Sequence, residues 1–184
     1  VGPAQSAQVS LTWTPTTEGP MQIKAQVYLA GDQNPLNDPS PPINVTVMPA
    51  GMFVITIGDG NELGRMPVDM FYMNSLFETL YYPQEIGMFG TISAISFYND
   101  FVTNLPNMPT KVWVGSTQNA DLTGGWIPST QLTQVFDGTV NYPSGQNVIT
   151  ISLQNPYVFV GGNLVMMVQR PMDTTYYNSQ DRFQ

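Results

Sequence analysis

Apolar residues in this chain recur at every second position over short stretches, and Gly, Pro, Asn or Asp interrupts these stretches roughly every 8 to 12 residues. This alternation is typical of β-strands, because successive side chains of a strand point to opposite faces of the sheet. Spacing typical of helices is almost absent. We therefore predict an all-β protein, with strands over residues 8–14, 21–29, 43–48, 53–57, 76–82, 90–98, 111–115, 131–136, 147–153 and 163–169.

Two of these strands carry patterns that also predict their surroundings. In the segment 147–153, apolar Ile149, Ile151 and Leu153 alternate with polar residues, so one face of this strand is expected to be buried and the other wet. In the segment 164–168, every residue is apolar. Such a run predicts a central strand covered on both faces; a strand that carries an intermolecular contact is the alternative.

In the segment 67–82 a helix competes with a strand. Four apolar residues fall near helical spacing, namely Met70, Met73, Phe77 and Leu80. The segment also holds several aromatic residues, which favour strands, and an Asn-Ser pair at residues 74 and 75 that is typical of a turn. We expect a strand here.

Proline and glycine between residues 48 and 51 divide the pattern into two modules. The first, residues 1–49, offers three clear strands, which is fewer than a closed β-sandwich needs. We expect it to be the C-terminal part of a domain whose other strands lie upstream. The second, residues 50–184, has enough strands for a β-sandwich with jelly-roll-like character, and we expect its end to be cut short.

The first module combines a Thr-Trp-Thr-Pro strand at residues 12–15, an acidic, Asn-rich loop at residues 32–38 and a final Val-Thr-Val strand at residues 45–47. This order resembles the C-terminal half of immunoglobulin-like modules of the CARDB and fibronectin-III-like type, found in bacterial surface proteins. The N-terminal strands of those modules have no counterpart in this sequence. The resemblance implies a partial immunoglobulin-like module.

The second module carries a Leu-Phe-Glu-Thr-Leu-Tyr-Tyr-Pro strand at residues 76–83, a Lys-Val-Trp-Val-Gly strand at residues 111–115 and an Arg-Pro-Met-Asp turn at residues 170–173. This order is similar to a β-sandwich module that recurs in large secreted proteins of Bacteroidetes-like and Cloacimonetes-like bacteria. The resemblance implies a secreted, multi-module, cell-surface protein, and it implies no catalytic residues.

The composition removes most familiar enzyme chemistry. The 184 residues include no His and no Cys, so the chain can supply neither a thiol nucleophile nor a His general base. Thirteen acidic against five basic residues give a net charge of -8, which disfavours binding to nucleic acid or to anionic membrane surfaces. No apolar run is long enough for membrane insertion. Ser, Thr, Asn and Gln take the place of surface Lys and Glu, which favours an extracellular protein.

Two kinds of ligand are compatible with particular residues. Asp59, Asn61 and Glu62 cluster hard oxygen donors in a Gly-rich turn that could hold Ca²⁺, although a solvated turn is the simpler explanation. No other cofactor is expected. Aromatic rings could stack against sugars, and we select those predicted in loops, namely Trp126, Tyr176 and Tyr177. Trp13 and Trp113 fall within predicted strands, and we expect them to fill the core between sheets.

The sequence therefore favours binding over chemistry. We expect a non-enzymatic structural or adhesive module of a larger extracellular or cell-surface bacterial protein, assembling into a filament or surface layer through β-edges and loops. Its expected partners are neighbouring modules or copies of the same protein, and glycans. The alternative is a carbohydrate-binding accessory module of a secreted hydrolase or peptidase.

Overall fold

The computed structural model describes residues 8–28, 30–31, 33–34, 36, 38–58 and 62–184. The chain divides into two compact units, residues 1–55 and 56–184. We describe each unit by itself. The structure is almost entirely β, with antiparallel sheets in both units, so the predicted all-β class is confirmed.

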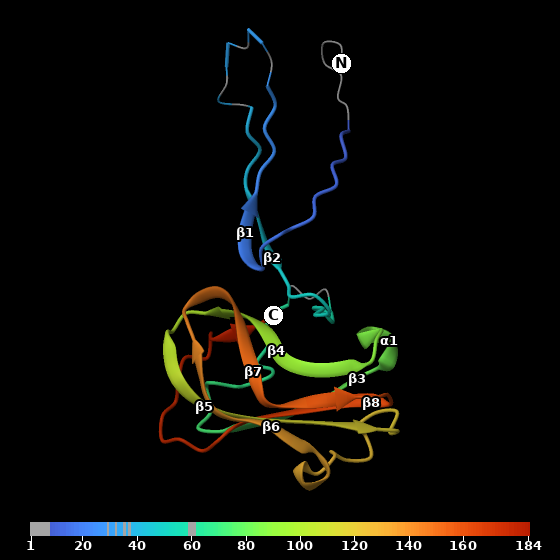
Figure 1. The fold of residues 1–184 in the computed structure, drawn as a ribbon. Coiled ribbons are helices and arrows are strands. Elements are labelled where there is room, and N and C mark those ends of the chain that lie inside the picture. The colour runs from blue at the N-terminus through green and yellow to red at the C-terminus, as the bar shows by residue number, and fades with distance from the viewer. Residues whose placement is uncertain (1–7, 29, 32, 35, 37, 59–61) are drawn as a thin grey trace. The chain divides into compact units, whose positions relative to one another are not determined.

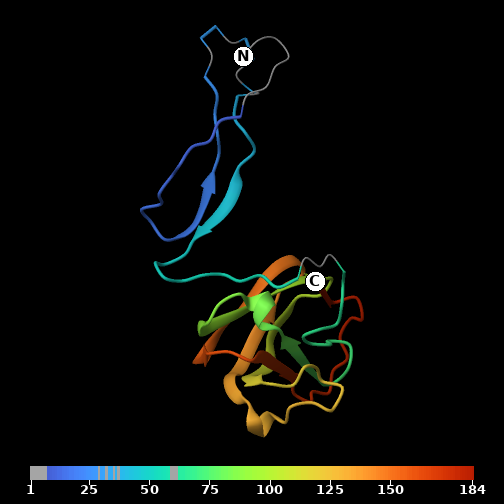
Figure 2. The same ribbon diagram turned by 90° about the vertical axis from the view of Figure 1, so that its right-hand side faces the viewer.

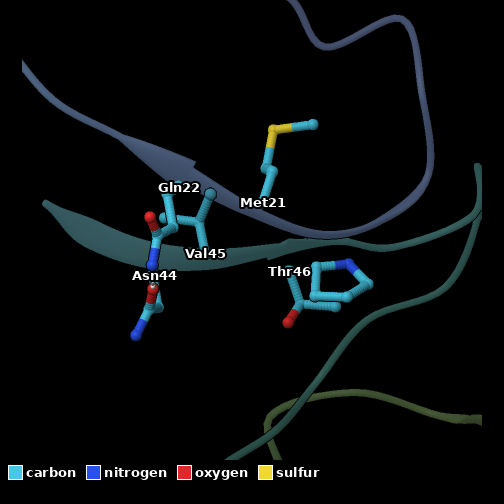
Figure 3. Close-up of a pocket in the computed structure, with 6 residues that line it drawn as sticks. Met21, Gln22, Asn44, Val45 and Thr46 are labelled. Atoms are coloured by element: carbon cyan, nitrogen blue, oxygen red, sulfur yellow. Dashed lines mark hydrogen bonds between the residues drawn. The ribbon is translucent and has the colours of Figure 1, made fainter.

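The first unit contains one antiparallel pair, β1 (Gly19–Ile23) and β2 (Ile43–Val47). Residues paired across the two strands share a face. One face is polar, and there the Gln22 side chain donates a 3.0 Å hydrogen bond to the Asn44 side chain. Figure 3 shows Met21 on one side of this ribbon and Asn44 and Thr46 on the other. The opposite face is apolar throughout and consists of Met21, Ile23, Ile43, Val45 and Val47, with Gly19 at its end.

That apolar face lacks a covering layer among the described residues. Met21, Val45 and Val47 are half-buried, whereas Ile23 and Ile43 expose 40% and 65% of their surface. An isolated two-stranded ribbon is marginally stable in water, because it cannot bury its apolar face. The first unit is thus one layer of a β-structure.

The second unit holds two antiparallel sheets arranged as two layers (Figure 1). The four-stranded sheet has the order β3 (Ser75–Tyr81), β8 (Asn163–Arg170), β5 (Leu105–Thr117) and β6 (Thr133–Tyr142). The three-stranded sheet has the order β7 (Gly145–Phe159), β4 (Gly90–Phe101) and β9 (Arg182–Phe183). A helical turn, α1 (Pro83–Ile86), follows β3, and a 3-10 turn, η2 (Ser129–Gln131), precedes β6, as the rotated view also shows (Figure 2).

Side chains that point between the two sheets form the core of the second unit. An aromatic cluster fills one end: Phe101 stacks on Tyr142 at 5.6 Å between ring centroids, and Phe183 meets both rings edge-on. Burying each such side chain stabilises the fold by about 1.5–3 kcal/mol. The predicted alternation in 147–153 is confirmed, because Ile149, Ile151 and Leu153 are buried and the residues between them are exposed.

The apolar run 164–168 is confirmed as a central strand, since β8 lies between β3 and β5 and all five residues are buried. Its second face is covered by the connection between β5 and β6, which crosses the outer side of the four-stranded sheet. Leu132 of this connection lies so close to Gly115 that a Cβ there would fall 2.5 Å from the Leu132 Cδ2 atom. Gly115 therefore permits the close approach that buries Val165 beside it.

The outer edge of β6 is blocked by side chains of β7. The Gln154 side chain accepts the Asp137 backbone N–H at 3.0 Å and donates to the Asp137 carbonyl at 3.1 Å. The Asn155 side chain donates to the Gln134 carbonyl at 3.2 Å. The Gln154 amide thus takes the place of a neighbouring strand's backbone, which satisfies this edge without a further strand.

Several predictions for particular segments are wrong. Residues 8–14 and 53–57 form no strand, because an alternating pattern selects a face but supplies no partner for the backbone. Trp13 exposes 53% of its surface and lies in no core. Trp113 does lie in a strand, β5, but it alternates with the buried Val112 and Val114 and therefore points away from the space between the sheets. In the segment 67–82 the expected strand is present as β3.

Burial raises the pKa of Tyr142 to about 12, and the hydrogen bond with Thr110 offsets part of this shift. In the unfolded chain the same phenol ionises near pH 10, so the unfolded state loses its proton first. We predict that the free energy of unfolding falls by about 2–3 kcal/mol more in the wild type than in Tyr142→Phe between pH 10 and pH 12. Urea unfolding of both proteins across this range measures it, and parallel curves would contradict it.

Candidate functional site

The predicted calcium site falls mostly outside the described residues. Asp59 and Asn61 belong to the part of the chain that the structure does not describe, and Glu62 has an exposed side chain. Within the described ranges, no three acidic side chains gather closely enough to hold a metal ion. The calcium site stays a prediction.

Trp126 lies in the connection between β5 and β6 and exposes 50% of its surface. The connection is tied to the sheet on both sides of this ring. The Tyr82 hydroxyl donates to the Ala120 carbonyl at 3.0 Å, and the backbone N–H of Ile127 donates to the Glu78 Oε1 atom at 2.8 Å. The ring is therefore attached to a segment with fixed contacts.

Glu78 is a buried acid on the outer face of the edge strand β3. Its side chain is 7% exposed, and its Oε2 atom has no hydrogen-bond partner among the described residues. Burial raises the pKa of this carboxyl, and the hydrogen bond from Ile127 partly offsets the shift. Its position under the β5–β6 connection makes Glu78 the anchor of the segment that carries Trp126.

The structure places the two adjacent tyrosines in different surroundings. Tyr176 exposes 59% of its surface, and its ring lies 6.2 Å from that of Phe71. Tyr177 is half-buried against the core, and its hydroxyl donates to the Asp173 Oδ2 atom at 3.2 Å. Tyr176 is therefore accessible to a ligand, whereas Tyr177 is engaged inside the fold. Neither tyrosine belongs to the segment that carries Trp126.

Tyr177 covers a buried arginine at the end of β8. The Arg170 guanidinium is 1% exposed and lies 5.0 Å from the centroid of the Tyr177 ring. Its Nη2 atom donates to the Asp173 Oδ2 atom at 2.8 Å and to the Thr175 carbonyl at 3.3 Å, and its Nη1 atom donates to the Tyr72 carbonyl. Arg170 thus joins two loops, residues 65–74 and 171–178, to the central strand.

The charge of Asp173 is stabilised by these neighbours. Desolvation acts to raise its pKa, but hydrogen bonds from Thr175, Arg170 and Tyr177, together with the charge of Arg170, leave the pKa below its ordinary value. Asp173 is therefore ionised at neutral pH and forms an ion pair with Arg170. This arrangement orders the loops and presents no reactive group to solvent.

A second feature of the unit is an unpaired strand edge. One edge of β4 pairs with β7 over most of its length, but β9 reaches the other edge only at Asn99 and Asp100, and Gln184 donates to the Tyr98 carbonyl at 2.9 Å. Within the described part of the chain, no segment pairs with that edge between residues 90 and 97. We call residues 90–97 the open edge.

Two features of the open edge favour the addition of a strand. It carries no proline and no charged residue, although both commonly protect exposed edges. Three of its side chains, Ile92, Ile95 and Phe97, pack against the core and yet remain half-exposed. An additional strand would cover these side chains and satisfy the free backbone groups.

Two open hollows do not coincide with the predicted ligand residues. One is lined by Pro20, Met21, Gln22, Asn44, Val45 and Thr46 of the first unit (Figure 3). The other is lined by Leu63, Asp100, Val102, Gln180 and Arg182. Neither hollow contains a buried polar group without a partner among the described residues.

Sequence reasoning did not find Glu78, Arg170 or the open edge. Residue type alone gives no signal for a buried charge, since Glu and Arg are ordinarily exposed. One signal was available for Glu78: in the alternating strand pattern it is an acid between the apolar residues Leu76 and Leu80, which share its face.

We predict that Arg170→Met lowers the free energy of unfolding by about 3–5 kcal/mol, because it leaves Asp173 and two carbonyls without their partner. The matched control is Lys111→Met, which removes a surface ion pair with Asp137 (3.0 Å) and is expected to cost less than about 1 kcal/mol. Chemical unfolding of the three proteins measures both values. Equal losses in the two variants would show that the Arg170 contacts contribute little.

We predict that the free energy of unfolding of the wild type increases relative to that of the Glu78→Gln variant as the pH falls from 7 toward 4. A carboxyl whose pKa is raised in the fold destabilises the folded state when it is ionised, and protonation removes this penalty. The glutamine keeps an oxygen that can accept the Ile127 N–H but does not titrate. Thermal unfolding of both proteins at a series of pH values measures the effect, and a constant difference would contradict the prediction.

Comparisons with protein-family models, with curated proteins and with solved structures find no match for this chain. Among the described residues, no helix is long and apolar enough to cross a membrane.

Proposed function

We propose that this chain is a non-enzymatic structural and adhesive module of a larger extracellular or cell-surface bacterial protein, and that it assembles with neighbouring modules or with copies of itself through strand edges. The observation that carries the proposal is the open edge of β4. The backbone groups of residues 90–97 that point away from β7 have no partner in the described part of the chain, and the core-facing side chains of this segment remain half-exposed.

Strand addition is favourable at such an edge for two reasons. Backbone hydrogen bonds of the incoming strand satisfy the free N–H and C=O groups, and its alternate side chains cover Ile92, Ile95 and Phe97. The edge of β3 carries the charged Glu78, and the edge of β6 is blocked by Gln154. β7, the other outer strand of its sheet, contains Pro156 and is joined to β6 through Gln154 and Asn155. The absence of charge and proline from residues 90–97 thus favours β4 as the accepting strand. A strand donated by the next copy in a head-to-tail arrangement would produce a filament.

The first unit supports the same proposal. Its ribbon has one polar and one wholly apolar face, which is the pattern of one layer of an immunoglobulin-like sandwich. We propose that this unit is the C-terminal part of such a module. It therefore needs strands from elsewhere to bury Met21, Ile43 and Val45.

Composition supports the non-enzymatic and extracellular parts of the proposal. The chain has no His and no Cys, and only 10% of its residues are charged. Its strongest electrostatic contacts, around Arg170 and Asp173, order loops and offer no nucleophile or base to a substrate. Repulsion by a net charge of -8 disfavours nucleic-acid partners.

We predict that the purified chain self-associates at micromolar concentration and that Ser96→Pro weakens this association about tenfold or more. Tyr98 directs its carbonyl away from β7, and Ser96, two residues earlier on the same strand, directs its N–H to the same side. Proline removes this donor from the open edge and leaves the β4–β7 ladder intact. Light scattering over a concentration series and electron microscopy measure the assembly.

Ser96→Ala is the matched control, because both variants lose the side-chain hydrogen bond with Thr150 (2.9 Å) and only proline removes the backbone donor. Association is expected to survive in the alanine variant. A wild-type chain that stays monomeric at every concentration, or equal association in both variants, would refute assembly through the open edge.

The second candidate function is that of a carbohydrate-binding accessory module of a secreted hydrolase or peptidase. It is favoured by the exposure of two aromatic rings on segments with fixed contacts, Trp126 and Tyr176. Flat, rigid rings supply contact area at a small cost in conformational entropy. This function is compatible with the adhesive one, since both require recognition of a surface polymer.

A further inference from the structure

We infer that Tyr72, Phe71 and Tyr176 form a preorganised aromatic platform that binds the apolar face of a neutral polysaccharide. The inference rests on the adhesive part of the proposed function and names the site and the ligand class. It does not involve the open edge.

The platform consists of two exposed rings joined by a half-buried one. Tyr72 exposes 54% of its surface and Tyr176 exposes 59%. The Phe71 ring contacts both of them. Its centroid is 5.1 Å from that of Tyr72, in an edge-on arrangement, and 6.2 Å from that of Tyr176. The two exposed rings come from loops about a hundred residues apart in the sequence.

The backbone that carries the rings is fixed by buried contacts. The Arg170 guanidinium donates to the carbonyl of Tyr72 and to the carbonyl of Thr175, the residue before Tyr176. One planar, buried group therefore sets the spacing between the two exposed tyrosines. Two backbone hydrogen bonds also join the loops: the Asp173 N–H donates to the Met73 carbonyl at 2.9 Å, and the Tyr177 N–H donates to the Met70 carbonyl at 3.2 Å.

This fixation matters for affinity. A site whose side chains are already in place loses little conformational entropy when a ligand binds. Tyrosine also combines a flat apolar ring with a hydroxyl that can donate or accept a hydrogen bond, which suits the alternating CH and OH groups of a sugar ring.

The charges around the platform favour a neutral ligand. The Arg65 guanidinium lies 5.4 Å from the Phe71 ring centroid and 6.0 Å from that of Tyr72, but Asp69 neutralises it through a 3.2 Å ion pair. The net charge of -8 repels anionic polymers.

Other exposed aromatic residues lack this combination. Trp126 is accessible, but no other aromatic ring of the described residues packs against it. Tyr98 exposes 47% of its surface on the outer face of β4, also without such a ring neighbour. Among the described residues, Tyr72 and Tyr176 are the exposed aromatic residues that share a ring neighbour, Phe71.

The test is retention of the full chain on three insoluble neutral polysaccharides, microcrystalline cellulose, chitin and xylan, with the anionic polymer alginate as a comparison. We expect retention on at least one neutral polymer and none on alginate. The double variant Tyr72→Ala/Tyr176→Ala is expected to lose about tenfold or more of that retention, whereas Tyr98→Ala is expected to keep it. A second pair, Tyr72→Leu/Tyr176→Leu, keeps apolar packing on Phe71 but removes the flat faces and the hydroxyls, and it should behave like the alanine pair.

Three results would overturn the inference: retention that survives both double variants, retention that is lost only in Trp126→Ala, or no retention on any neutral polymer. Retention on alginate that the double variants abolish would overturn the neutral ligand class. Self-association of the same variants, measured by light scattering, separates the two proposals. If the platform variants self-associate normally but do not bind polysaccharide, the open edge is still the proposed assembly surface. If the wild type binds polysaccharide but does not self-associate, only the strand-edge proposal is refuted.

Discussion

The ordered surface of the second unit depends on one buried guanidinium. Arg170 ends the central strand β8, and from there its side chain reaches the carbonyls of Tyr72 and Thr175 and the carboxylate of Asp173. Two loops that are distant in sequence thereby adopt a single mutual arrangement. Because the group is 1% exposed, its hydrogen bonds are shielded from competition with water, and the ionised Asp173 balances its charge. The backbone positions of Tyr72 and Tyr176 therefore depend on the hydrogen bonds of Arg170.

The edge strands of the second unit differ in how their free backbone groups are protected. At β6, the amide of Gln154 imitates a neighbouring backbone and closes the edge with a side chain. At β4, the ladder stops after β9 has covered Asn99 and Asp100, and neither charge nor proline protects the remaining residues. Natural proteins usually protect exposed edges, since a free edge recruits other strands. In the described part of the chain, β4 therefore keeps free backbone groups between residues 90 and 97, whereas side chains satisfy part of the β6 edge.

The amino-acid pattern sufficed to predict strands but not their partners. The alternation of Ile149, Ile151 and Leu153 and the apolar run 164–168 predicted burial correctly, because each depends on the strand's own periodicity. The alternating residues 8–14 form no strand, since a ladder requires a second chain segment that the pattern does not specify. Trp113 was expected between the sheets but lies on the outer face of β5. The sequence of β5 does not show that the β5–β6 connection covers this outer face. The burial of Arg170 and Glu78 escaped prediction because it arises from loops that fold over them. Trp126 and Tyr176 do lie exposed in loops, and their binding of a ligand stays a prediction.

The position of β8 has a consequence for the order in which this unit can fold. β8 lies between β3 and β5, and its register joins Ser75 to Arg170 and Lys111 to Gln169. A chain synthesised from its N-terminus therefore produces both flanking strands long before the strand that separates them. Until residue 170 is available, β3 and β5 lack the partner that joins them, and their apolar residues remain in contact with water. Contacts of such large sequence separation slow folding, since much chain entropy is lost before they form. The middle of the sheet is thus completed only after β8 has been made, and until then a nascent chain exposes apolar residues of β3 and β5 that can aggregate.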